Sequence, residues 1–390
     1  MVQDNAHSIA VDNGVSARLL TTFKIDWQQP DLTEDLRTQL AAVDPAHVFV
    51  FASGPDALSA ICAAADDAIP GLSITGCTTA GQIGVDGYED VDSIIIALPK
   101  AHFATRSIVL EDLQDLEPQT LVDRLVQERM QLTGQTPDKP NGFGFLLVDG
   151  LSRQEDILAA SIAPGMGEWP IFGGSSGDGT RFEQTYLAHG RNIHSAKAIV
   201  TFVRTDCETR VFSLNHLEPT DRKMIVTRAD PEARIVKEIN AEPAAREYAR
   251  IVNKDPDQLD EFTFAAHPVV VRLGDTHHVR AIQRVNENGE LVFFAAIDEG
   301  MVLNVATPYD IADHLDKELS EMALGRGEVD VFACDCLLRR MEASQNQRVR
   351  AVSDVLSSNR VVGFSTYGEQ IGPLHVNQTM TGVMLVNPSQ

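Results

Sequence analysis

The chain has 390 residues, of which 43% are hydrophobic and 23% charged, and 32 basic against 56 acidic residues give a formal net charge of −24 at pH 7. This composition is typical of a globular chain with room for two or three units that share a large core. Because so acidic a chain repels polyanions and its basic residues form no long run, we expect neither nucleic acid nor a membrane surface as a partner.

The first residues and the cysteines indicate the cellular compartment in which the protein is expected. No window approaches about 18 consecutive apolar residues, the length that a membrane-spanning helix requires. The first residues carry neither the basic region nor the apolar segment of a secretory signal. Five scattered cysteines are too few, and odd in number, for a disulfide framework. We therefore expect a cytoplasmic protein.

In chain order, residues 1–17 are polar and aperiodic, and we expect a disordered tail there. Residues 47–53 form an apolar run typical of a buried strand, and residues 57–68 have the pattern of a helix that follows a glycine–proline break. A second strand at 72–75 runs into a Gly-Cys-Thr-Thr-Ala-Gly turn at 76–81, and a third strand is predicted at 93–98.

The same order of elements returns twice. A strand, a helix, a strand with a Gly-Gly-Ser-Ser turn and a further strand are predicted at 144–150, 154–163, 170–178 and 198–203. Their counterparts near the end of the chain, with a Gly-Phe-Ser-Thr turn, are predicted at 329–334, 344–356, 360–368 and 382–386. The pattern predicts an α/β fold of mixed sheets covered by helices, built from repeated strand–helix–strand units.

The stretch between the second and third occurrences has a different character. It is more polar and is punctuated by prolines, and helices are predicted at 233–240 and 244–252. Strands at 269–271, 279–282 and 291–294, joined by turns at 274–275 and 288–289, predict an antiparallel meander. A domain boundary is placed within 215–235, which divides the chain into domains at 18–220 and 221–390.

The three Gly-x-[Ser/Thr]-[Ser/Thr] turns are the first candidate site. Small residues and free backbone N–H groups at strand ends can line a ligand pocket or hold an anion, but the same turns are also explained as tight structural turns. They match neither the phosphate-binding loop nor the dinucleotide fingerprint. The candidate pocket residues are Cys77, Thr78, Thr79, Ser175, Ser176, Ser365 and Thr366.

A hydrolase is the second possibility. Ser175 lies in a Gly-x-Ser-x-Gly sequence, the letters of a nucleophile elbow, but a turn follows it where the elbow requires a helix. Cys77 and Cys334 would be nucleophiles if paired with a histidine, although cysteines at strand ends are commonly buried small hydrophobes. We expect no catalytic residue and no enzymatic activity.

A histidine near the end of the chain is the third candidate. His375 lies in a polar loop opened by a glycine and a proline, between the last Gly-Ser/Thr turn and the last strand. A neutral imidazole in such a loop could ligate a metal or a haem iron, or could serve only as a hydrogen-bonding residue.

Two separated motifs resemble a known family, the FIST sensory proteins. Residues 76–83, preceded by the strand that ends at Ser53, resemble the FIST N-terminal domain. Residues 363–370, continuing to His375 and Thr379, resemble the FIST C-terminal domain. The resemblance covers residues 45–386, and the order and size of the domains are similar to those of the stand-alone FIST proteins of the NosP subgroup.

This resemblance implies a cytoplasmic signalling protein and not an enzyme. It implies that the protein binds haem b, senses nitric oxide at the haem iron and regulates a partner histidine kinase, and through it cyclic-di-GMP output and biofilm behaviour. We expect His375 as the iron ligand, with Tyr367 and Asn377 in the cofactor site. The alternative is a FIST module that senses a small organic ligand such as an amino acid in a pocket of Gly-Ser/Thr turns. The oligomeric state is open, a homo-oligomer included.

Overall fold

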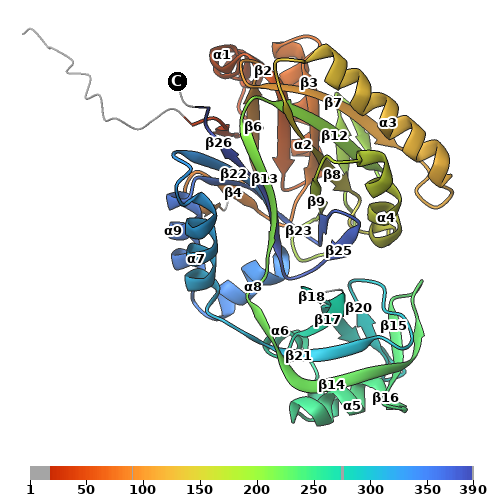
Figure 1. The fold of residues 1–390 in the computed structure, drawn as a ribbon. Helices are drawn as coiled ribbons and strands as arrows, with labels where there is room; N and C mark the ends of the chain where they lie inside the picture. Colours follow the sequence, from red (N-terminus) through yellow and green to blue (C-terminus); the bar gives the residue numbers. More distant parts are fainter. Residues whose placement is uncertain (1–17, 90, 274–275, 389–390) are drawn as a thin grey trace, which may run out of the picture.

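The computed structural model describes residues 18–89, 91–273 and 276–388. The predicted tail at 1–17 and the turn at 274–275 lie outside the described residues. The expected α/β fold of mixed sheets and helices is confirmed in this general form. Residues 18–216 and 309–388 form three six-stranded sheets with their helices, here called the α/β part, and residues 217–308 form a separate antiparallel sheet, here called the β part (Figure 1).

The first sheet contains the first predicted strands. Its strands lie in the order β1 (Thr21–Lys24), β6 (Ser93–Pro99), β2 (Pro45–Ala52), β3 (Ser73–Thr78), β10 (Leu187–His189) and β11 (Asn192–His194). The helices α1 (Leu32–Val43) and α2 (Pro55–Ala68) pack on it through apolar side chains such as Leu36 and Ile61. The proline at the first position of α2 suits a helix start, where its missing N–H has no partner to lose.

The second sheet also has six strands, and the positions of its strands in the sheet correspond to those of the first sheet. Its strands are β7 (Phe103–Leu110), β12 (Ala198–Thr205), β8 (Asn141–Val148), β9 (Ile171–Ser175), β24 (Glu369–Ile371) and β25 (Leu374–Val376). The helices α3 (Pro118–Gln135) and α4 (Glu155–Met166) pack against each other beside it (Figure 1).

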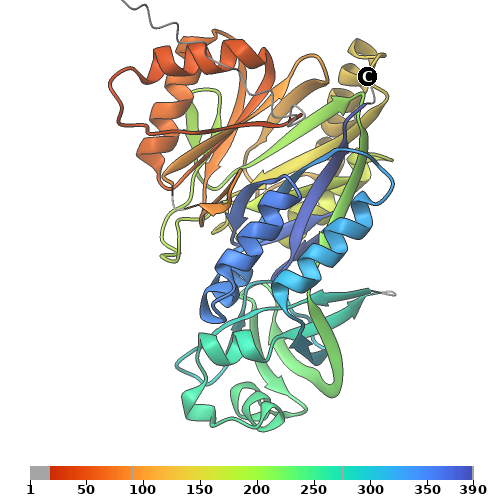
Figure 2. The same ribbon diagram turned by 90° about the vertical axis from the view of Figure 1, so that its left-hand side faces the viewer.

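The third sheet joins segments from both ends of the chain. Its strands are β13 (Glu208–Leu214), β26 (Met380–Val386), β22 (Val329–Cys336), β23 (Val361–Thr366), β4 (Gln82–Gly84) and β5 (Gly87–Glu89). Figure 2 shows two of its helices, α7 (Ile311–Ala323) and α9 (Val349–Ser358), side by side. The helix predicted at 344–356 is wrong in extent, because α8 (Leu337–Gln345) follows β22 directly and a left-handed Gln347 separates it from α9.

The three sheets exchange hairpins in a closed cycle. The hairpin β4–β5 leaves the first sheet after β3 and pairs with β23 of the third sheet. The hairpin β24–β25 leaves the third sheet and pairs with β9 of the second, and β10–β11 leaves the second and pairs with β3 of the first. The segments that follow β3, β9 and β23 therefore meet in the centre of the α/β part.

The first glycine of each predicted turn lies within a strand, so the placement of these three glycines in turns was wrong. Gly76, Gly173 and Gly363 belong to β3, β9 and β23, and each pairs with the preceding parallel strand. A Cβ atom on Gly173 would lie 2.1 Å from the carbonyl oxygen of Leu146, and the other two glycines approach their partner strands as closely. Glycine is required there because the neighbouring backbone leaves no room for a side chain.

Phenylalanines join the three sheets at the centre. The side chains of β2 alternate, so that Phe49 and Phe51 face this central cluster while Val48 and Val50 face the helices. The ring of Phe51 stacks on that of Phe364 with centroids 4.2 Å apart, and Phe145 lies 4.7 Å from Phe332. Burial on both faces explains the uninterrupted apolar runs of the strands.

The β part differs most from the sequence prediction. Its strands are β14 (Leu217–Asp230), β15 (Ile235–Ile239), β16 (Glu242–Pro243), β17 (Val269–Leu273), β18 (Thr276–Val279), β19 (Ile282–Val285), β20 (Leu291–Phe293) and β21 (Val302–Pro308). Its helical segments are α5 (Ala244–Val252), η1 (Pro256–Gln258) and α6 (Glu261–Ala266). The predicted helix at 244–252 is confirmed as α5, but the helix predicted at 233–240 is wrong, because β15 pairs there with β14 and β20.

The strands predicted to form one meander form two separate hairpins. β17 pairs with β18 and β19 pairs with β20, but the sheet order β18-β17-β21-β14-β15-β20-β19 places the two hairpins at opposite ends. The strand predicted at 279–282 is split between β18 and β19. Within the described residues, no helix combines the length and apolar character needed to cross a membrane. The domain limits at 220 and 221 stay a prediction.

Candidate functional site

The predicted pocket residues gather where the three sheets meet, but they are buried in the core. Each is at most 2% exposed, and Thr78 borders a small open cavity of about 180 Å³. Backbone hydrogen bonds close the junction: Gly177 N–H donates to the carbonyl of Thr78 (2.9 Å), and Ser365 N–H donates to that of Gly81 (2.7 Å). The residues that the structure brings together here are Cys77, Thr78, Thr79, Ser175, Ser176, Ser365 and Thr366.

The nucleophile candidates lie in the same core. Burial raises the pKa of Cys77 and of Cys334 well above its usual value, so both thiols stay protonated at neutral pH. Ser175 is fully buried at the end of β9, and its Oγ accepts a hydrogen bond from Nε2 of Gln370 at 3.1 Å. An amide donor cannot accept a proton from a hydroxyl, so this contact provides no general base.

A buried carboxyl group completes the junction. Glu369 is fully buried on β24 and accepts hydrogen bonds from the hydroxyl groups of Thr366 and Thr379, the latter at 2.7 Å. Burial raises the pKa of Glu369 to about 8. The group is therefore a neutral acid at pH 7, which suits its apolar surroundings and removes a charge from the core.

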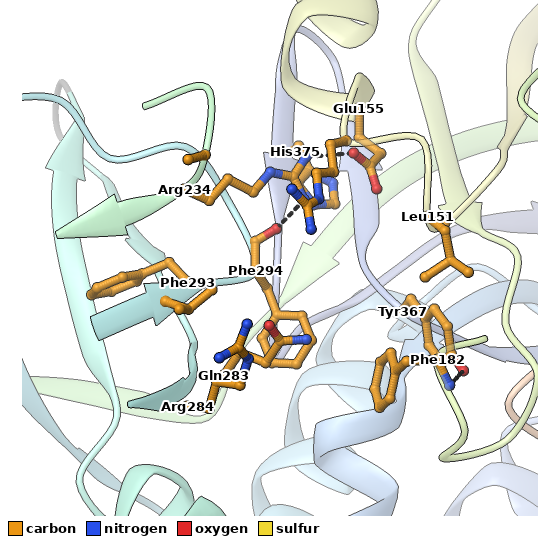
Figure 3. A pocket seen from close by; sticks show the side chains of 14 residues that line it. Leu151, Glu155, Phe182, Arg234, Gln283, Arg284, Phe293, Phe294, Tyr367 and His375 are labelled. Carbon is orange, nitrogen blue, oxygen red and sulfur yellow. Dashed lines mark hydrogen bonds and ion pairs between the residues drawn. The ribbon is translucent and has the colours of Figure 1, made fainter. Parts of the chain in front are cut away.

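An open cavity of about 370 Å³ lies beside this junction, between the α/β part and the β part (Figure 3). Its size falls within the range of about 300–1,000 Å³ that small-molecule sites occupy. The α/β part contributes Gly150, Leu151, Arg153, Glu155, Phe182, Tyr367 and His375, and the β part contributes Ala233, Arg234, Gln283, Arg284, Val292, Phe293 and Phe294.

Aromatic side chains form one wall of the cavity. The rings of Phe182 and Tyr367 stack with centroids 4.2 Å apart, and Phe294 lies 5.9 Å from Phe182 across the gap between the two parts (Figure 3). A second cavity of about 330 Å³ shares Phe182, Phe294 and Arg284 with the first and is lined largely by apolar side chains such as Met341. Apolar surface is thus available to a ligand on both sides of Phe182.

Tyr367 and Asp178 fix this wall. The Tyr367 hydroxyl donates to Oδ1 of Asp178 and accepts from the backbone N–H groups of Asp178 (3.1 Å) and Phe182 (3.2 Å). The Asp178 carboxylate also accepts from the N–H groups of Phe182, Glu183 and Gln184 at 2.9 to 3.0 Å. Burial alone would raise the pKa of Asp178, but these hydrogen bonds outweigh it, and the pKa is lowered.

The cationic side chains at the cavity differ in their pairing. Arg234 is buried and held in place, because it donates to the carbonyl of Phe294 (2.6 Å) and pairs with Glu155 and Asp156. Arg153 and Arg284 are exposed, and their guanidinium groups have no hydrogen bond or ion pair with any part of the chain that the structure describes. Two guanidinium groups at the cavity therefore remain available to a ligand.

The three predicted cofactor residues are close in sequence but differ in access. Tyr367 and His375 border the cavity, whereas Asn377 is fully buried, and neither of its amide atoms has a partner within the described residues. Nδ1 of His375 lies 3.2 Å from Nε2 of Gln370, and the Cε1–Nε2 edge of the ring packs over Gly368. Burial lowers the pKa of His375, so the imidazole is neutral.

The geometry of His375 bears on the haem expectation. An iron ligand needs open space in front of a ring nitrogen, but His375 is only 3% exposed. Its ring would have to leave the contacts with Gln370 and Gly368 before a porphyrin could reach it. The residues as placed do not fit haem.

Most cavity residues belong to no motif that the sequence shows. Arg234 lies in the stretch predicted as a helix, and Phe182 and Arg284 belong to no recognised motif. They meet only because the β part folds back onto the loop after β9. A usable signal was the Phe293–Phe294 pair at the end of a predicted strand, since two successive aromatic residues place one ring on each face of a sheet.

Comparison with known proteins agrees with the two motifs. The family model described as FIST N domain matches residues 46–242, and the model described as FIST C domain matches residues 244–372. No curated protein matches the chain.

Proposed function

The chain belongs to the FIST family, whose domains make it a signal-transduction sensor module, and we propose that it senses a small organic anion, such as an amino acid or another carboxylate, in the cavity between the α/β part and the β part. The expectation of a small-ligand sensor thus moves from the Gly-Ser/Thr junction to the neighbouring cavity, because the junction is closed. No catalytic step is part of the proposal.

The observation that carries the proposal is the pair of unpaired guanidinium groups of Arg153 and Arg284 at the cavity. In a chain with a net charge of −24, an anion needs local positive charge of this kind in order to bind. Guanidinium groups bind carboxylates through two parallel hydrogen bonds, which gives both affinity and orientation. The two groups lie on opposite parts of the protein, so one anion could contact both.

The aromatic wall supplies the second element of recognition. A ligand held by the guanidinium groups would place its apolar portion against Phe182, Phe294 and Tyr367. A volume of about 370 Å³ suits a molecule of amino-acid size or somewhat larger. Arg234 is neutralised by Glu155 and therefore shapes the cavity without adding net charge.

A thermal-shift screen of amino acids and small carboxylates tests the proposal. A ligand present at 100 times its Kd adds about 2.7 kcal/mol to the stability of the folded state. The ligand that raises the melting temperature of the wild-type protein should fail to do so in Arg284→Gln. Arg350→Gln is the matched control, since Arg350 is an exposed arginine of α9 outside the cavity lining.

Haem is the second candidate ligand, because His375 and Tyr367 lie in the cavity wall, but its binding would require the His375 ring to leave its contacts with Gln370 and Gly368. As placed, His375 does not fit an iron ligand. An absorption spectrum after haem addition distinguishes a haem sensor from a sensor of a small organic anion. A protein-bound Soret band that shifts with nitric oxide and disappears in His375→Ala would favour haem, and the absence of any bound Soret band would remove it.

The output is proposed to pass to a protein partner in the cytoplasm, such as a histidine kinase. Two connections link the α/β part to the β part, and they touch where the N–H of Tyr309 donates to the carbonyl of His216 at 2.8 Å. A ligand that contacts both parts would favour one angle between them, which is a known way to control a partner surface. Kinase autophosphorylation measured with and without the sensor and its ligand tests this step.

A further inference from the structure

A cluster of three different metal-ligating side chains lies at the far end of the second sheet from the cavity residues of β25. β7 and β12 pair so that Phe103 faces Thr205. The residue before Phe103 is His102, and the residues after Thr205 are Asp206 and Cys207, so two turns bring the three side chains to one edge. Within the described residues, no other group of three His, Cys, Asp or Glu ligand atoms gathers as closely.

The distances are those of a preformed ligand set. Nδ1 of His102 lies 3.1 Å from both carboxylate oxygens of Asp206, and Sγ of Cys207 lies 3.7 Å from Oδ1 of Asp206. All the ligand atoms lie within 4.8 Å of one another. Bond lengths of about 2.0–2.3 Å around a tetrahedral zinc ion place neighbouring ligand atoms about 3.3–3.6 Å apart, so the ligand atoms have to approach one another by at most about 1.5 Å.

Both turns are held by further hydrogen bonds. The N–H of His102 donates to the carbonyl of Pro99 at 3.1 Å. The N–H of Cys207 donates to Oγ1 of Thr205 at 3.1 Å, and Asn141 donates from Nδ2 to the carbonyl of Cys207 at 2.8 Å. Outer contacts of this kind keep ligating residues in position in metal sites.

We propose that His102, Asp206 and Cys207 bind a divalent transition-metal ion of the zinc and cobalt class. A thiolate together with an imidazole selects such ions over magnesium and calcium, which prefer oxygen ligands. Cys207 closes the inner side of the site, whereas the His102 and Asp206 side chains are each 34% exposed and give the ion access from solvent. Three protein ligands leave a fourth position for water. This site is independent of the proposed sensing cavity.

Cobalt titration of the full chain, treated with a chelator and freed of any affinity tag, tests the proposal. We expect one equivalent of Co²⁺ to produce visible bands of a tetrahedral ion together with a near-ultraviolet thiolate-to-cobalt charge-transfer band. One equivalent of Zn²⁺ should displace the cobalt and remove both. Cys207→Ala should lose the charge-transfer band, and His102→Ala and Asp206→Asn should each weaken binding at least about tenfold, the usual loss when even an outer contact is removed.

The controls are His194→Ala, a histidine of β11 outside the cluster, and Cys62→Ala, a buried cysteine of α2. Both should keep the wild-type spectrum and affinity. The proposal is overturned if wild-type protein gives no charge-transfer band, if the band survives in Cys207→Ala, or if neither His102→Ala nor Asp206→Asn weakens binding. Because His102 and Asp206 are partly exposed, their variants should fold, as circular dichroism would verify, and they keep the test decisive if Cys207→Ala does not.

Discussion

The ring of Tyr367 stacks on the ring of Phe182, with centroids 4.2 Å apart and ring planes inclined by 23°. Tyr367 follows β23 and Phe182 lies between β9 and β10, so the stack joins two of the units that meet at the central junction. It also forms the cavity wall opposite the β part. The hydroxyl group of Tyr367, bonded to Asp178 and to the N–H of Phe182, sets the position of both rings.

Removing that hydroxyl group should loosen the wall. Tyr367→Phe leaves the buried carboxylate of Asp178 and two backbone N–H groups with one partner fewer, and we expect a loss of about 1–3 kcal/mol in the free energy of unfolding. Urea unfolding measures it. Tyr186→Phe, which removes a more exposed hydroxyl bonded to Gln184 at 2.9 Å, should change stability by about 0.5 kcal/mol or less. Equal losses in the two variants would contradict this account.

The buried Glu369 predicts a fall in stability at alkaline pH. Its pKa is raised by burial to about 8 in the folded protein, against 4.5 for the free group. An acid that holds its proton more tightly when folded stabilises the protein fully below its unfolded pKa, and this contribution is lost as the pH rises from 4.5 through about 8. Urea midpoints measured between pH 6 and pH 9 should therefore decline. Glu369→Gln, which is neutral at every pH, should flatten that decline, and an unchanged slope in this variant would be inconsistent with the assignment.

The strand glycines predict a severe effect of a single methyl group. In Gly173→Ala the new Cβ would meet the backbone carbonyl oxygen of Leu146 at 2.1 Å, and a backbone atom inside a sheet cannot move aside as a side chain can. We expect a loss of at least about 1–3 kcal/mol, the usual cost of overpacking. Gly134→Ala is the matched control, because no atom lies within 4 Å in α3 and alanine favours a helix, so its stability should stay equal or rise by up to about 1 kcal/mol. A tolerated Gly173→Ala would refute the close-approach explanation.

The α/β part could be predicted well because its signals are local. Apolar runs such as that of β2 and breaks such as Gly54–Pro55 identified strands and helix starts without knowledge of their partners. The errors have physical causes. The apolar residues of β15 have a helix-like spacing, but Ile235 and Val236 suit a strand and pairing with β14 decides the outcome. Gly76, Gly173 and Gly363 look like turn residues, although it is the partner strand that requires them.

The candidate site was only partly predictable. His375 and Tyr367 were identified because they belong to a contiguous motif, and the structure places both at the cavity. The structure also brings together the hydroxyl-bearing residues of the junction, as the sequence predicted, but the hairpin exchange buries them. Arg284 and Phe182 could not be found from local sequence, since 102 residues and the fold of the β part separate them. Hairpin exchange and the packing between the two parts are features of tertiary structure, and a short sequence pattern cannot predict them.

Calorimetric titration of the purified chain with the best ligand from the amino-acid and carboxylate screen decides whether the cavity binds a small organic anion. The account predicts one ligand per chain in the wild type and in Arg350→Gln. It predicts a loss of at least about tenfold in affinity in Arg284→Gln and in Arg153→Gln, since a bidentate charged contact contributes about 1.5–3 kcal/mol. If no member of the screen binds, or if the best ligand binds both cavity variants as tightly as it binds the wild type, the claim that this cavity senses a small organic anion is contradicted.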